Sequence, residues 1–169
     1  MAGKGLSFRS MKALLFFKRI LTHRYLALLL RLYIGALFIY ASMYKINYTG
    51  EFAETIAGYQ IVPYWAVNIL AIVLPWVELI SGVLLVAGIR ARSSAVIIGL
   101  LLTMFAIAMS INLMRDAPIS CGCFHAIGEK ISLWTLVRDI IWVIMAIHIF
   151  FFDRAFHLER RFSLIFREI

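Results

Sequence analysis

The chain has 169 residues, of which 63% are hydrophobic and 15% are charged, and its mean hydropathy is +0.92. A soluble domain of this size would have too few polar residues to cover its surface, so the composition excludes a soluble protein and indicates an integral membrane protein. The formal net charge of +8 would suggest nucleic acid as the partner of a soluble protein. Beside apolar spans, clustered Lys and Arg instead mark the side that faces anionic lipid, so we expect a lipid bilayer and no nucleic acid as the partner.

Residues 1–24 form a basic segment with six Lys or Arg residues and no Asp or Glu. Its apolar residues are interrupted by Lys18 and Arg19, which argues against the uninterrupted core of a signal peptide. We expect this segment to be a basic interfacial helix that lies on the cytoplasmic leaflet. A basic tail without regular structure is the alternative.

Four apolar runs follow, and they cover residues 25–46, 64–89, 93–113 and 131–152. Each run is close to the roughly 20 residues that a helix needs to cross the hydrocarbon core. Because a segment inside lipid must satisfy its own backbone hydrogen bonds, helices are favoured over strands in spite of the many Val and Ile residues. The sequence therefore predicts an all-α, polytopic membrane protein in which residues 25–152 form a four-helix transmembrane bundle.

Residues 153–169, after the last run, form a second basic segment. Its apolar residues recur at spacings of four, three and four residues, at Leu158, Phe162, Ile165 and Ile169. This spacing places them on one helical face, so the segment is predicted to be a second amphipathic interfacial helix. Both termini are thus expected to lie along the membrane surface.

The distribution of Lys and Arg between the two sides of the membrane predicts the orientation. The two terminal segments and the turn at residues 90–92 together carry twelve of these residues, whereas the opposite side carries three, Lys45, Arg115 and Lys130. Because positive residues are retained inside, both termini are predicted to be cytoplasmic. Residues 114–130 then face outward, into the periplasm if the protein lies in the inner membrane of a Gram-negative bacterium. Disulfides form and persist in that compartment.

Five charged residues interrupt the apolar runs: Arg31, Lys45, Glu78, Arg138 and Asp139. Charges in the bilayer core are costly, so they usually face the bundle interior and mark either ion pairing or function. A lone carboxylate there would bind a proton, because desolvation disfavours its charged form. The expected depths favour an ion pair between Glu78 and Arg31, with Arg138 as the alternative cation. The cluster is interpreted either as an ion pair that fixes helix register, or as a pocket for a quinone head group or a proton path.

Small and polar residues predict which face of each helix is turned inward. In the first run this face holds Arg31, Gly35, Phe38, Ser42 and Lys45. In the second run it holds Asn68, Ala71, Pro75, Glu78 and Gly82, and in the third Gly99, Thr103, Ala106 and Ser110.

Cys121 and Cys123 are the only two cysteines, and they are separated by one residue in the outward joint. A disulfide between them would be strained, and strained disulfides exchange readily. His125, Arg115 and Lys130 are near enough in sequence to stabilise a thiolate. Three interpretations stay open: a redox pair, an inert structural disulfide, and a Cu(I) or Zn site formed by both cysteines and His125. The metal site lacks an evident fourth ligand, so we assign no metal ligands.

The motif INLMRDAPISCGCFH at residues 111–125, followed by ISLWTLVRDIIW at 131–142, resembles the family of the methylamine-utilisation protein MauE, within the wider DoxX-like group of membrane proteins. The blocks RLYIGALFIYASMYKI at 31–46 and IVPYWAVNILAIVLPWVELISGVLLVAGI at 61–89 resemble other parts of that family. The resemblance implies a four-helix membrane protein that supports extracytoplasmic disulfide chemistry. In the namesake pathway this means maturation of a disulfide-rich dehydrogenase subunit alongside a thioredoxin-like partner.

The leading hypothesis is therefore a thiol–disulfide oxidoreductase in which Cys121 and Cys123 cycle between dithiol and disulfide. Its expected partner is a periplasmic thioredoxin-like protein or a disulfide-rich client, and a quinone would receive the electrons without any covalently bound cofactor. That layout is analogous to DsbB and to vitamin K epoxide reductase. The alternatives are a non-catalytic accessory or assembly subunit bound to other membrane subunits, and a Cu- or Zn-binding membrane protein.

Overall fold

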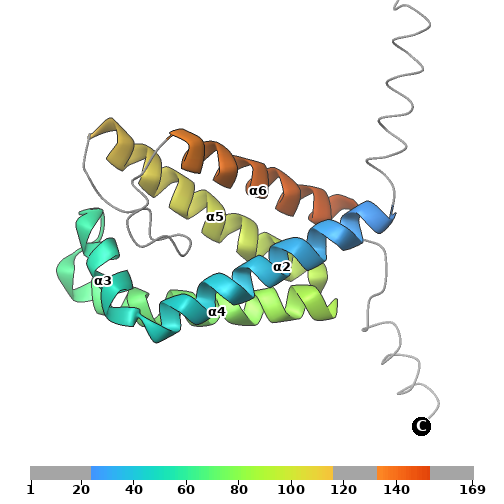
Figure 1. The fold of residues 1–169 in the computed structure, drawn as a ribbon, viewed down its shortest axis with the longest axis horizontal. Helices are drawn as coiled ribbons and strands as arrows, with labels where there is room; N and C mark the ends of the chain where they lie inside the picture. The colour runs from blue at the N-terminus through green and yellow to red at the C-terminus, as the bar shows by residue number, and fades with distance from the viewer. Residues whose placement is uncertain (1–23, 116–132, 153–169) are drawn as a thin grey trace, which may run out of the picture.

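The computed structural model describes residues 24–115 and 133–152, and this part of the chain is helical throughout apart from short turns. The helices are α2 (Arg24–Asn47), α3 (Thr49–Gly58), α4 (Tyr64–Ala87), α5 (Ala91–Met114) and α6 (Leu133–Phe152). Figure 1 shows the four long helices running side by side, with α3 at one end of the bundle. The predicted all-α fold is confirmed, whereas the expected interfacial helices at the two termini lie outside the described residues.

The four long helices confirm the predicted membrane spans. Each of α2, α4, α5 and α6 is long and apolar enough to cross a membrane, with 20 to 24 residues in the apolar segment. Their ends differ from the predicted ends by at most two residues. The protein is therefore a multi-pass membrane protein, and charged side chains in the middle of its spans are expected to face the bundle interior.

The turn between α4 and α5 is short because the backbone reverses within three residues. Gly88 has a φ of 73° and caps α4 in the left-handed conformation, which glycine adopts without steric cost. Its N–H donates to Leu85, and the N–H of Ile89 donates to Leu84. These bonds satisfy carbonyls at the helix end, so α5 can begin at once and return along α4.

Helix α3 lies in the joint at residues 47–63, between the first two spans, where no helix was predicted. Phe52, Ile56 and Tyr59 follow the spacing of one helical face, and all three are buried. Phe52 and Ile56 pack on α4 and α5 in a cluster that includes Phe105. The short helix therefore closes one end of the bundle.

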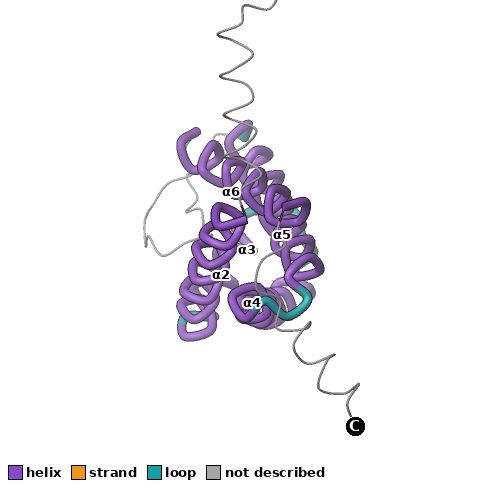
Figure 2. Tube along the Cα trace, turned by 90° about the vertical axis from the view of Figure 1, so that its right-hand side faces the viewer, coloured by secondary structure: helices purple, strands orange, loops and turns teal. Residues whose placement is uncertain are grey.

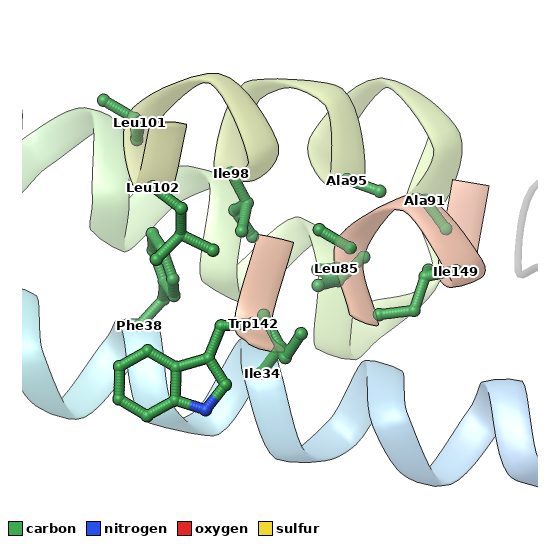
Figure 3. Packing of buried hydrophobic residues seen from close by; sticks show 11 residues of the cluster. Ile34, Phe38, Leu85, Ala91, Ala95, Ile98, Leu101, Leu102, Trp142 and Ile149 are labelled. Carbon is green, nitrogen blue, oxygen red and sulfur yellow. The ribbon is translucent and has the colours of Figure 1, made fainter. Parts of the chain in front are cut away.

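The bundle is held together by two extensive helix pairs, α2 with α4 and α5 with α6. In the end view of Figure 2 the four long helices surround a common centre. The α2–α4 pair approaches closely because glycines face each other at the crossing: a Cβ on Gly82 would lie 3.0 Å from the carbonyl oxygen of Gly35. The main apolar cluster joins all four long helices, and in Figure 3 Phe38, Leu102 and Trp142 converge from α2, α5 and α6.

The predicted inward faces are confirmed for α2 and largely for α4. All five residues on the predicted face of α2 are buried, and on α4 only Asn68 is exposed. The prediction for α5 was wrong, because the buried face holds Ile98, Leu102, Phe105, Met109 and Asn112. The hydroxyls of Thr103 and Ser110 each donate to a carbonyl of their own helix, at 2.7 Å in both cases. Such residues need no interior position, because the helix itself satisfies their hydrogen bonds.

Candidate functional site

The charged centre of the bundle is an ion pair between Lys45 on α2 and Glu78 on α4. The Lys45 Nζ atom donates to both carboxylate oxygens of Glu78, at 2.7 and 2.9 Å. Both side chains are almost fully buried, with 5% and 2% exposure. The same ammonium lies 5.0 Å from the centroid of the Phe52 ring and 4.7 Å from that of Phe105. Two carboxylate oxygens and two aromatic faces thus replace the water that this cation loses.

Helix geometry explains why these two residues meet although they lie at different depths. Counted from the Gly35–Gly82 crossing, Lys45 lies about 15 Å toward the α3 end and Glu78 about 6 Å. Side chains on a helix lean toward its N-terminus. Because α2 and α4 are antiparallel, Lys45 leans toward the bundle centre and Glu78 leans toward the α3 end. The two side chains therefore close the remaining gap of about 9 Å between their levels.

The predicted ion pair between Arg31 and Glu78 was wrong. Arg31 lies on the other side of the glycine crossing, about 12 Å from the level of Glu78, and its side chain leans away from that level. Among the described residues, the ion pair at Glu78 is made by Lys45. Arg31 is nevertheless buried, with 3% exposure, so the prediction that it faces the interior is confirmed.

Arg138, the alternative cation for Glu78, has a different contact. Its guanidinium carbon lies 4.9 Å from the centroid of the Trp142 ring, one turn further along α6. A stacked guanidinium on an aromatic face is a favourable arrangement for a cation that is partly removed from water. Arg138 therefore lies on α6 beside the charged centre and is not the partner of Glu78.

Asp139 on α6 completes the charged centre. It is 0% exposed, and it lines a cavity together with Lys45 and Glu78. The volume of this cavity is about 10 Å³, which is room for about one water. Both carboxylate oxygens of Asp139 lack a hydrogen-bond partner among the described residues. A quinone ring is larger than this space, and the predicted quinone pocket among the charged residues stays a prediction.

The cysteine motif lies outside the described residues, as do His125 and Lys130. Arg115, the third residue predicted to tune a thiolate, is exposed at the end of α5, where its N–H donates to the carbonyl of Asn112 at 3.1 Å. The segment with the cysteines connects Arg115 to Leu133, and Figure 1 shows that α5 ends and α6 begins at the α3 end of the bundle. Both connection points therefore lie at the end toward which Lys45 is displaced.

Sequence reasoning missed the aromatic part of this site. Phe52 and Phe105 both cover the Lys45 ammonium, yet Phe52 lies on the helix that was not predicted. The spacing of Phe52, Ile56 and Tyr59 was the available sign. Phe105 follows Leu102 by three residues and precedes Met109 by four, which is the apolar spacing that would have identified the interior face of α5.

Comparison with known proteins identifies the family. The family model described as methylamine utilisation protein MauE matches residues 23–152. The chain belongs to the MauE family. The resemblance found in the cysteine motif and the span blocks is thereby confirmed.

Curated members of the MauE family match between 57% and 71% of this chain. The methylamine utilization protein MauE of Paracoccus denitrificans is 32% identical over 71% of this chain and 66% of its own length. The MauE protein of Methylorubrum extorquens is 34% identical over 57% of this chain and 53% of its own length. The MauE protein of Paracoccus versutus is 28% identical over 70% of this chain and 64% of its own length. The matches thus cover between about half and two thirds of these relatives. No solved structure matches the chain.

Proposed function

We propose that this MauE-family protein is a membrane-embedded thiol–disulfide redox protein that supports disulfide formation, or the maturation of a redox enzyme, outside the cytoplasm. The named relatives act in methylamine utilisation, so the client is proposed to be a disulfide-rich enzyme subunit of that kind of pathway. One observation carries the proposal: the segment with both cysteines joins α5 and α6 at the α3 end, on the side of the glycine crossing where Lys45 and Glu78 lie with Asp139.

The proposed reaction is a two-electron exchange at Cys121 and Cys123. In the oxidising direction a reduced client thiol pair transfers two electrons and two protons to the Cys121–Cys123 disulfide, which becomes a dithiol. A membrane quinone then takes two electrons and two protons from the dithiol and leaves as quinol. Because the interior cavity holds only about one water, the quinone is proposed to dock outside the Lys45–Glu78–Asp139 cluster, near the cysteine segment.

The orientation of the protein is part of the proposal. The excess of Lys and Arg on the side of the termini favours cytoplasmic termini and a periplasmic cysteine segment in the inner membrane. A thioredoxin-like protein on the periplasmic side would then be the redox partner. Residues His125, Arg115 and Lys130 are proposed to favour the thiolate form, because positive charge and hydrogen-bond donors stabilise it.

The redox potential of the cysteine pair tests the proposal. The full-length protein in detergent is equilibrated in glutathione buffers of known potential, its free thiols are alkylated, and the masses are counted. We expect a potential in the range of oxidising thiol proteins, about −120 to −180 mV. A potential below about −300 mV identifies a permanent disulfide and supports an accessory or assembly subunit instead.

Electron transfer is the second part of the test, with reduced thioredoxin as the electron donor and a short-chain ubiquinone as the acceptor. Cys121→Ser and Cys123→Ser should each abolish quinone reduction, whereas Ser120→Ala is the matched control and should not change it. If both cysteine variants keep the wild-type rate, the redox proposal fails. Stoichiometric Cu or Zn in protein purified without chelators would replace it with the metal-binding alternative.

A further inference from the structure

Asp139 is an ionisable group beside the Lys45–Glu78 ion pair that takes no part in the pair. Its side chain is fully buried and faces the same cavity as the pair. Neither of its oxygens accepts a hydrogen bond from any described residue. A carboxylate held there in its charged form would have lost its water without a hydrogen bond in exchange, and a protein interior tolerates that state poorly.

Among the described residues, the groups that line the cavity with Asp139 do not supply a spare positive charge. From α2 comes the Lys45 ammonium, but it already binds both oxygens of Glu78 from α4. From α5 the cavity receives only the apolar side chains of Leu102 and Phe105. With one cation and one anion already paired, an ionised Asp139 would leave the cavity with a surplus negative charge.

Arg138, the neighbouring cation on α6, does not neutralise an ionised Asp139 by direct contact. The Arg138 guanidinium lies over the ring of Trp142, 4.9 Å from its centroid. Its charge acts on Asp139 through space, but the Asp139 oxygens receive no hydrogen bond from it. A through-space attraction of this kind offsets only part of the loss of hydration.

We propose that this cavity is a proton-binding site in the membrane interior, at which the Asp139 carboxylate takes up one proton from water. The resulting carboxylic acid donates a hydrogen bond to a single water, and that water donates to Glu78. The cavity volume of about 10 Å³ fits one such water. With the proton bound, the cavity holds one positive and one negative charge, and every carboxyl group in it has a hydrogen-bond partner.

The site lies close to the end of the bundle at which α6 begins. Asp139 lies six residues after Leu133, or about 9 Å along α6 from the point where the cysteine segment joins. The inference goes beyond the proposed redox function and does not depend on it, since it follows from the cavity alone. A full-length protein in which Cys121 and Cys123 are replaced by Ser should therefore keep the proton site.

Infrared spectroscopy of the purified full-length protein tests the proposal, because a protonated carboxylic acid has a carbonyl band distinct from those of ionised carboxylates. The wild type at neutral pH should show one such band, which shifts in heavy water. Asp139→Asn should remove the band, and Asp139→Glu should move it. Glu51→Gln, which changes an exposed carboxylate on α3, is the control and should leave it unchanged.

The variant Lys45→Met provides an independent test in the same infrared measurement. Glu78 would lose its cation and take up a proton of its own, so a second band should appear. A wild type without the band, or a band that survives Asp139→Asn, overturns the proposal. A band that vanishes when sodium replaces choline in the buffer would also overturn it, because the cavity would then be a metal-cation site.

Discussion

Removal of the Glu78 carboxylate is the perturbation that most directly tests the charged centre. Glu78→Gln keeps the size of the side chain and leaves the Lys45 ammonium without its anion. At the observed 2.7 Å and an effective dielectric constant of about 20, the direct attraction between the two charges is about 6 kcal/mol. Part of this is offset because the variant no longer desolvates a carboxylate. Breaking a buried pair by removing one partner typically costs about 3–5 kcal/mol.

We expect Glu78→Gln to lower the free energy of unfolding by about 3 kcal/mol, the lower end of that range. The reason is that Asp139 lines the same cavity and can give up its proton to become the new anion for Lys45. For a protein of this size such a loss lowers the melting temperature by on the order of 10 °C. Thermal unfolding of the detergent-purified protein, followed by tryptophan fluorescence, measures the effect.

Two variants make the Glu78 result decisive. Glu51→Gln is the matched control, because Glu51 is exposed and accepts only a 3.3 Å hydrogen bond from Tyr44; its effect should stay within about 0.5 kcal/mol. The double variant Lys45→Met with Glu78→Gln removes both charges and should recover most of the loss. If Glu78→Gln melts at the same temperature as Glu51→Gln, the ion pair contributes nothing and the account of the charged centre is refuted.

Two further predictions concern packing and orientation. Gly82→Ala should destabilise the protein by about 1–3 kcal/mol in the same melting assay, because its Cβ would lie 3.0 Å from the Gly35 backbone. Gly99→Ala, whose Cβ would make an ordinary 3.8 Å contact, should be neutral or slightly stabilising, and equal melting of the two variants would contradict the crossing geometry. In a cysteine-free background, a membrane-impermeant thiol reagent added to intact cells should label Glu54→Cys and not Ser93→Cys, both exposed positions; the reverse labelling would invert the proposed orientation.

The membrane spans could be predicted almost completely from the sequence, because twenty apolar residues in a row have few alternatives to a transmembrane helix. The inward faces were harder to predict, since hydrophobicity does not distinguish a lipid-facing residue from a buried one. On α2 and α4 charged side chains identified the interior. On α5 the stripe of Gly99, Thr103 and Ser110 misled the prediction, because hydroxyls bonded to their own helix are tolerated anywhere.

The pairing within the charged centre could not be predicted from depth alone. Depth counted from an assumed membrane boundary placed Arg31 beside Glu78, but the glycine crossing sets a different register between α2 and α4. The direction in which side chains lean then decides the partner. The sequence indicates the direction in which each side chain leans, but it does not give the register between α2 and α4. It could therefore be predicted that Lys45 faces the interior, whereas its pairing with Glu78 could not be predicted.

The enclosure of Lys45 by Phe52 and Phe105 has a consequence for ionic strength. Mobile ions screen exposed charges over a distance of about 8 Å at physiological salt. They do not enter a centre in which the cation is bound by Glu78 and covered by two rings. The pairing inside the bundle is therefore insulated from the salt content of the surrounding solution, which can vary widely around a membrane protein while the geometry of its interior charges stays the same.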